Sequence, residues 1–135
     1  MAGPSVELLQ RVPLFAELEP RELQRLSGSF KERIFEPGES VVAEGEHVAR
    51  FFVISSGEAI VKVHGDERGR LGPGDYFGEI ALLRDVPRTA TVVAATDADL
   101  FALDRDDFLP AVTGHAASTQ AADAVIGSRL GVSTV

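Results

Sequence analysis

Residues 74–83 read GDYFGEIALL, and residues 87–92 read PRTATV. The first stretch puts Gly78 and Glu79 at the start of a short apolar segment that we expect to be helical. Exposed backbone N–H groups at a helix start attract an anion, and a glycine leaves the backbone bare where a ligand must come close. The guanidinium of Arg88 can grip a phosphate through two parallel hydrogen bonds. A carboxylate repels phosphate, so the natural partner of Glu79 is a hydroxyl, as on a sugar. These groups predict a site for a small anionic ligand that carries a ribose.

The two stretches resemble the phosphate-binding cassette of cyclic nucleotide-binding domains, as found in cAMP receptor proteins, cyclic-nucleotide-dependent kinases and gated channels. That cassette reads Phe-Gly-Glu-hydrophobic-Ala-Leu and, after a spacer, Arg-small-Ala-Thr-Val. Here these motifs stand at residues 77–82 and 88–92, with Pro87 before the arginine as in many members. The resemblance extends to the upstream glycines Gly38, Gly45 and Gly57, and covers roughly residues 8 to 131. The stretch ALDRDDFL at 102–109 and the alanine-rich tail look like bacterial versions of the domain.

The resemblance implies a role for each residue of the cassette. Arg88 would meet the exocyclic oxygens of the cyclic phosphate, and the N–H groups of Ala81 and Thr89 would complete that cradle. Glu79 would accept the ribose 2′-OH, together with the carbonyl of Gly78. The implied ligand-binding set is Phe77, Gly78, Glu79, Ile80, Ala81, Leu82, Arg88, Thr89 and Ala90.

The choice of nucleotide stays open at this level. The hydroxyl of Thr89 suits either the phosphate or the 2-amino group of a guanine turned syn, so both cAMP and cGMP are candidate ligands. Family members close the pocket over the base with an aromatic or long side chain, and beyond Phe108 this chain has no Phe, Tyr or Trp. The candidate base contacts are Val61, Ile126, Arg129 and Leu130.

Composition limits the classes of function. A chain of 135 residues with 44% hydrophobic and 25% charged residues is ordinary for one soluble domain. The lack of cysteine excludes disulfides, thiolate zinc sites and a cysteine nucleophile, and the net charge of -8 argues against direct binding of nucleic acid. No apolar run approaches the roughly 20 residues of a membrane span, and MAGPS at the start lacks the features of a signal peptide. We expect a cytoplasmic protein, or the cytoplasmic part of a larger one.

Enzymatic chemistry is not expected. The histidines His47, His64 and His115 fall in different turns and a helix start, without the spacing of a metal site, and no Ser–His–Asp pattern stands out. A cupin-like metalloenzyme shares the double-stranded β-fold but needs clustered histidines, so it is a remote alternative. We therefore predict no catalytic residue and no metal.

Hydrophobic periodicity predicts helices, then strands, then helices. A helix is expected at 5–12 and another from Pro20, which suits a first helical position. Strands are expected from Arg33 and at 40–43, 50–55, 59–63, 68–71, 89–94 and 99–103, with Gly-rich turns between them. Asp104 suits the N-cap of a following helix, in which Pro110 should cause a kink or an early end. An alanine-rich helix is expected at 116–130.

The fold expected from these features is α+β: a β-roll of the double-stranded β-helix (jelly-roll) type with helices at both ends. A single domain would cover 1–135, with N-terminal helices in 5–30, the β-roll at 31–104, the cassette at 77–92 and C-terminal helices at 105–131. The expected function is a sensor that binds a cyclic nucleotide reversibly and relays occupancy through its helices. The alternative is a structural or protein-interaction domain without ligand, against which the intact Gly78, Glu79 and Arg88 argue.

A sensor needs an output, and the sequence leaves its form open. An attached effector domain, including a membrane transporter as in some bacterial members of the family, would suit the pattern. So would a separate protein partner or a homodimer. Neither direct nucleic-acid binding nor membrane insertion is expected.

Overall fold

The computed structural model describes residues 3–47, 50–79, 82 and 87–113. Its elements begin with the helices α1 (Val6–Gln10), η1 (Pro13–Phe15, a 3₁₀ turn) and α2 (Pro20–Ser27). The strands follow as β1 (Lys31–Phe35), β2 (Ser40–Val42), β3 (Arg50–Ser56), β4 (Ala59–Val63), β5 (Asp66–Leu71), β6 (Tyr76–Phe77), β7 (Thr91–Ala94) and β8 (Ala98–Asp104). Helix α4 (Arg105–Thr113) comes last, and the helix expected at 116–130 lies outside the described residues.

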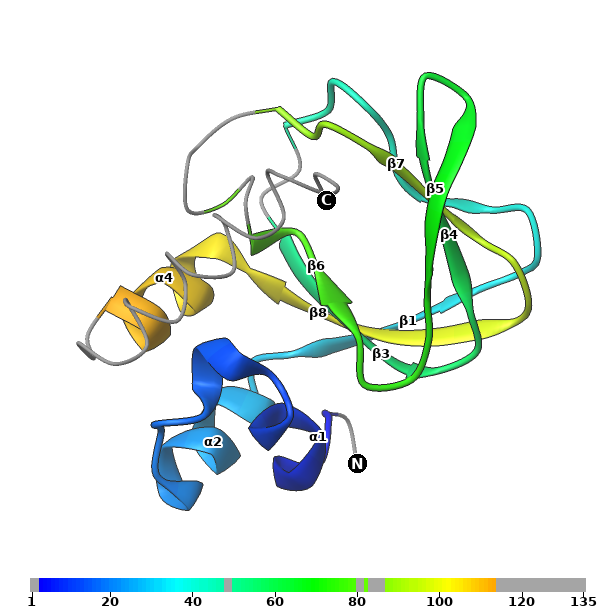
Figure 1. The fold of residues 1–135 in the computed structure, drawn as a ribbon. Coiled ribbons are helices and arrows are strands. Elements are labelled where there is room, and N and C mark those ends of the chain that lie inside the picture. The colour runs from blue at the N-terminus through cyan, green and yellow to red at the C-terminus, as the bar shows by residue number, and fades with distance from the viewer. Residues whose placement is uncertain (1–2, 48–49, 80–81, 83–86, 114–135) are drawn as a thin grey trace.

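The strands form two antiparallel sheets with nested pairing. One sheet has the order β1-β8-β3-β6 and the other β2-β7-β4-β5. Strand β1 pairs with β8, β2 with β7, β3 with β6 and β4 with β5, which is the pairing of a jelly roll. Figure 1 shows the roll on one side and helices α1, α2 and α4 gathered on the other. The predicted β-roll with flanking helices is confirmed.

The centre of the first sheet, formed by β3 and β8, is buried on both faces because it separates two hydrophobic clusters, whereas its edge strand β1 is largely exposed. Strand β3 has four consecutive buried residues, 51–54. Phe52 and Ile54 belong to the cluster inside the roll, and Phe51 and Val53 to the cluster under the helices. Alternation along a strand sends neighbouring side chains to opposite faces. A continuous apolar run is therefore what a strand between two cores requires.

The helices begin where local signals place them. The Ser5 side chain accepts the N–H of Leu8 at 3.1 Å at the start of α1. Pro20 is the first residue of α2, as expected, and the N–H of Glu19 donates to the Glu22 carboxylate at 3.1 Å in a capping box. These contacts satisfy backbone N–H groups at the two helix starts.

Helix α4 decides one of the two alternatives expected at Pro110, an early end. It runs through Pro110 and ends only at Thr113, so the proline does not end the helix early. Pro110 is exposed, and so is Asp106, whose carbonyl loses its helical donor. Water can satisfy that carbonyl on the exposed side. The missing hydrogen bond therefore costs too little to stop the helix.

Three turns of the roll share one local design. They read EPGE at 36–39, AEGE at 43–46 and GPGD at 72–75. In each, the fourth residue's carboxylate accepts the first residue's N–H at 2.7 Å. The fourth residue's N–H also donates to the first residue's carbonyl, at 3.0, 3.2 and 2.9 Å. Each turn is thus closed by two hydrogen bonds between its first and fourth residues, one to the fourth residue's carboxylate and one between backbone groups.

Candidate ligand-binding site

Two opposite charges are buried at the junction between strands β6 and β7. Within the described ranges, the buried polar or charged side chains are Glu79, with 0% of its surface exposed, and Arg88, with 4%. Glu79 directly follows Gly78 after strand β6 and has helical conformation, and Arg88 comes shortly before strand β7. Burying a charge is costly unless an opposite charge or a ligand compensates. The fold therefore places these two side chains specifically.

Gly78 lets three chain segments converge at this point. Its φ is +101°, a left-handed conformation that favours glycine. A Cβ at this position would lie 2.7 Å from the Arg50 carbonyl oxygen and 2.8 Å from Nη1 of Arg88. The carbonyl of Gly78 accepts the N–H of Leu82 at 3.3 Å, as at a helix start. Any side chain here would displace the guanidinium or the neighbouring strand.

Arg88 is held through both its side chain and its main chain. Nη2 donates to the carbonyl of Arg50, the first residue of β3, at 2.5 Å. The N–H of Arg88 donates to the carbonyl of Glu46 at 2.8 Å, and its carbonyl accepts the N–H of Gly45 at 2.8 Å. The turn at 43–46 therefore grips the backbone while β3 orients the guanidinium. An arginine fixed at both ends can present its fork in one direction.

The electrostatics favour an anionic ligand with hydroxyl groups. Burial lowers the pKa of the Arg88 guanidinium, and the charges of Glu79 and then Glu46 act against that lowering. Arginine still keeps its proton. The site thus combines a desolvated cation, which binds an anion strongly, with a buried carboxylate, which accepts hydroxyl donors.

The other residues predicted for the site separate into distinct places. Phe77 is fully buried inside the roll, where its ring stacks on Phe52 with centroids 5.0 Å apart. Val61 and Ala90 belong to the same cluster. The side chain of Leu82 belongs to the other cluster, under the helices, and that of Thr89 is exposed. The remaining candidates, Ile80, Ala81, Ile126, Arg129 and Leu130, lie outside the described residues.

Sequence reasoning missed the groups that hold Arg88. The carbonyls of Arg50 and Glu46 and the N–H of Gly45 act through the backbone. Backbone contacts leave no side-chain signature. The one available signal was Gly45 in the Glu-Gly-Glu turn, which marks the place where the chain turns but not what it holds.

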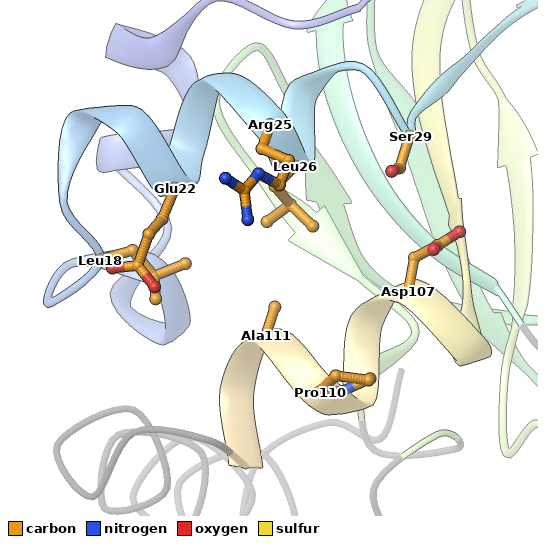
Figure 2. A pocket seen from close by; sticks show the side chains of 8 residues that line it. All are labelled: Leu18, Glu22, Arg25, Leu26, Ser29, Asp107, Pro110 and Ala111. Carbon is orange, nitrogen blue, oxygen red and sulfur yellow. The ribbon is translucent and has the colours of Figure 1, made fainter.

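A separate groove lies at the helical end of the molecule. It has a volume of about 300 Å³ and is lined by residues of α2 and α4 and the segments beside α2 (Figure 2). None of the site residues predicted from sequence lines it. In the part of the chain that the structure describes, no group of three or more potential ligands could hold a metal ion. No helix within the described ranges has the length and apolarity to cross a membrane.

Comparison with known proteins identifies the family. Residues 32–115 match the family model of the cyclic nucleotide-binding domain. The chain belongs to this family. Its cyclic nucleotide-binding domain is 40% identical over 102 residues to the cAMP-dependent protein kinase regulatory subunit of Yarrowia lipolytica, covering 74% of this chain and 27% of that protein. It is 41% identical over 109 residues to the cGMP-dependent protein kinase of Eimeria tenella, covering 79% of this chain and 11% of that protein.

A solved structure shows the same fold over nearly the whole domain. The structure described as Sp-2Cl-cAMPS bound to PKAR CBD2 superposes with a TM-score of 0.77 at 26% identity. The match covers 96% of this chain and 90% of that one. By contrast, this domain spans only a small part of the two kinase relatives above.

Proposed function

We propose that this cyclic nucleotide-binding domain is a sensor that binds cAMP or cGMP reversibly through Arg88 and Glu79. The observation that carries the proposal is the burial of these two opposite charges beside Gly78. The guanidinium takes the exocyclic oxygens of the cyclic phosphate, and the carboxylate takes the ribose 2′-OH. A phosphate with an adjacent ribose hydroxyl matches both buried groups at once.

The rest of the predicted set has supporting roles in this proposal. The N–H groups of Ala81 and Thr89 complete the phosphate cradle, and Val61 of strand β4 and Ala90, just before strand β7, contact the ligand from inside the roll. The base lies against Val61 and the tail residues Ile126, Arg129 and Leu130. Thr89 follows Arg88 and is exposed, and its hydroxyl serves either the phosphate or the 2-amino group of a syn guanine.

The domain performs no chemistry in this proposal and passes occupancy to an output through its helices. The relatives are a kinase regulatory subunit and a kinase, so a protein kinase is the first partner to test. An attached transporter and a homodimer are alternative outputs. Co-purification of the full-length protein, with and without cyclic nucleotide, separates these three. The lack of cysteine fits a reducing compartment, and we propose a cytoplasmic location.

Calorimetric titration of the domain with cAMP, cGMP and adenosine tests the binding. We expect saturable heat with at least one cyclic nucleotide and none with adenosine at the same concentrations, because adenosine lacks the phosphate that Arg88 recognises. Equal heat with adenosine would mean that the phosphate is not read. No heat with either cyclic nucleotide would favour a domain that has kept the fold for protein interaction.

A further inference from the structure

The turn at 43–46 is joined to the segment that carries Arg88 by three hydrogen bonds. Two of them are the backbone bonds of Arg88 to Gly45 and Glu46, each 2.8 Å long. The third comes from the N–H of Glu44, which donates to the hydroxyl of Thr91 at 3.1 Å. Thr91 is the first residue of strand β7, three positions beyond Arg88. The turn is therefore bonded to this segment both at the arginine and at the start of strand β7.

The same turn is fastened to the β4–β5 hairpin by the Glu44 carboxylate. Its Oε1 accepts the N–H of His64 at 2.7 Å, and its Oε2 lies 3.6 Å from Nδ1 of the same residue. The Glu44 side chain is 27% exposed, although the His64 ring is 85% exposed. His64 has φ +52° in the tight hairpin turn, so its N–H direction is fixed by the backbone. Glu44 thus fixes the turn to the β4–β5 hairpin.

We propose that Thr91 and Glu44 are positioning residues for the phosphate-binding arginine. Thr91 fixes the register between the turn and the arginine segment, and Glu44 fixes the turn to the hairpin. Neither side chain contacts the guanidinium in this scheme; both act through the backbone bonds of Gly45 and Glu46 to Arg88. The inference rests on the proposed function, because it assigns these residues to the geometry of that same site.

A small displacement is enough to matter at such a site. The guanidinium, which donates to the Arg50 carbonyl, lies at the far end of a long flexible side chain. If the backbone of Arg88 moves relative to the turn, the fork turns with it and loses its alignment with a bound anion. Recognition by two parallel hydrogen bonds depends on that alignment.

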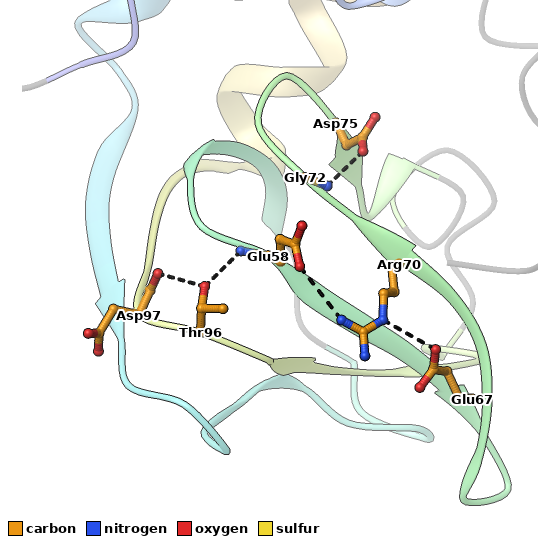
Figure 3. A network of polar contacts seen from close by, with 7 residues as sticks. All are labelled: Glu58, Glu67, Arg70, Gly72, Asp75, Thr96 and Asp97. Carbon is orange, nitrogen blue, oxygen red and sulfur yellow. Dashed lines mark hydrogen bonds and ion pairs between the residues drawn. The ribbon is translucent and has the colours of Figure 1, made fainter.

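The chain offers a matched control for Thr91. At the β3–β4 turn, the N–H of Glu58 donates to the hydroxyl of Thr96, also at 3.1 Å (Figure 3). This is the same kind of contact, a threonine hydroxyl accepting the N–H of a glutamate in a turn. Thr96 pairs with the β3–β4 turn, whereas Thr91 pairs with the turn that holds Arg88. Thr91→Val and Thr96→Val therefore each remove such a hydrogen bond from a different turn, and Thr96→Val also removes the bond from its hydroxyl to the Asp97 carbonyl.

The first experiment compares cAMP affinity and thermal stability of these variants by calorimetry. Thr91→Val should weaken binding by roughly three- to tenfold, the effect of one lost neutral hydrogen bond. Thr91→Ser, which keeps the hydroxyl, should restore wild-type affinity, and Thr96→Val should bind as the wild type does. Wild-type affinity in Thr91→Val, equal losses in both valine variants, or no recovery in Thr91→Ser would each overturn the role of Thr91.

The second experiment needs no ligand and tests Glu44. Amide hydrogen exchange is measured at Gly45 and Arg88 in the ligand-free wild type, Thr91→Val, Glu44→Ala and Glu44→Gln. We expect faster exchange at both amides in Thr91→Val and Glu44→Ala, and near wild-type exchange in Glu44→Gln, whose side-chain oxygen can still accept the His64 N–H. Unchanged exchange in Thr91→Val and Glu44→Ala would overturn the inference. If the wild type binds neither cyclic nucleotide, the proposed function fails. The exchange result still decides whether Thr91 and Glu44 fix the backbone of Arg88.

Discussion

Arg88 combines deep burial with a guanidinium that strand β3 orients, and the fork geometry of a guanidinium suits a phosphate. Replacing Arg88 tests whether this residue binds the phosphate. Arg88→Ala should lower the affinity for cAMP by at least tenfold, because charge-assisted hydrogen bonds contribute about 1.5–3 kcal/mol. Arg88→Lys should recover only part of the loss, since an ammonium has no fork. Calorimetry with Arg70→Ala as the control, an exposed arginine paired with Glu58 and Glu67, should show unchanged binding.

A second prediction concerns Glu79, because a buried carboxylate accepts hydrogen bonds from hydroxyl groups. Wild type should bind 2′-deoxy-cAMP more weakly than cAMP, because the carboxylate then lacks its hydroxyl partner, at a cost of about 1–3 kcal/mol. Glu79→Ala should bind both nucleotides nearly equally. The measurement is the ratio of the two dissociation constants in each protein. The same ratio in wild type and variant would show that Glu79 does not contact the 2′-OH.

Gly78 and Gly38 show two different reasons why a position requires glycine: the backbone conformation and the lack of space for a Cβ. Both have positive φ, +101° and +89°, but a Cβ at Gly78 would collide with Arg50 and Arg88 whereas one at Gly38 meets nothing within 4 Å. Gly38→Ala should therefore cost only the backbone strain, about 1–2 kcal/mol, and leave binding intact. Gly78→Ala should cost more stability and abolish binding. Thermal melts and titration of both variants measure this, and normal binding by Gly78→Ala would contradict the close packing at the site.

The residues proposed for the core of the site were selected from the sequence because each has a distinctive chemical group: a bare backbone, a carboxylate or a guanidinium. Gly78, Glu79 and Arg88 were selected from two stretches, and the structure places the glycine against the guanidinium and the carboxylate within its electrostatic reach. The supports of Arg88 could not be read in that way. A carbonyl such as that of Arg50 is available at every position of a chain, so only the fold shows which one is used.

Strand prediction succeeded where alternation was long enough to see. Strand β4 spans Ala59–Val63, the predicted range. Strand β6, Tyr76–Phe77, was missed, because two residues are too few for a periodic signal. Strand β5 begins at Asp66, two residues before the predicted start at Arg68, because the turn at His64 and Gly65 is a tight hairpin with positive φ at both positions. The hydrogen bonds by which the carboxylates of Glu39, Glu46 and Asp75 close the three turns were not predicted from the sequence.

At the pairing of strands β1 and β8, the carboxyl group of Asp99 makes the free energy of unfolding depend on pH. Asp99 lies opposite Ile34 in the ladder, so Glu32 is its diagonal neighbour on the same face. Burial, together with the hydrogen bond and the negative charge of Glu32, raises the pKa of Asp99 to about 6. The folded protein therefore keeps a proton that the unfolded chain, with an ordinary aspartate pKa near 3.8, has already lost.

Between those two pKa values, the stability contributed by this proton falls as pH rises, and above pH 6 it is gone. Asp99→Asn keeps a neutral side chain that can still donate a hydrogen bond, so it should melt higher than wild type at pH 7. The difference in melting temperature should shrink as pH falls from about 6 to 4. Asp97→Asn, an exposed neighbour, is measured alongside as the control. A pH-independent difference for Asp99→Asn would contradict the raised pKa.

Across the whole molecule, the cassette joins the two hydrophobic clusters. Phe77 ends strand β6 inside the roll, and Leu82, a few residues later, packs in the cluster that also holds Phe15, Phe51 and Phe108. Gly78 and Glu79 lie between those two anchors in sequence. A ligand that shifts this segment must therefore change packing around Leu82. The ring of Phe108, in α4, stacks on Phe51 with centroids 5.0 Å apart, so the helix shares that cluster. This gives a physical route from the site to the helices.

The last prediction tests that route with two matched cavities. Leu82→Ala and Leu100→Ala each remove a buried leucine, at a cost of about 2–5 kcal/mol, but Leu82 packs under the helices and Leu100 inside the roll. In the wild type, cAMP should increase the hydrogen-exchange protection of amides in α4. Leu100→Ala should keep that increase, whereas Leu82→Ala should lose most of it. Coupling between two sites is reciprocal, so weakening the link must also change the effect of the helices on affinity. An equal ligand-induced increase in both variants would mean that the signal leaves the site by a path that does not pass through Leu82.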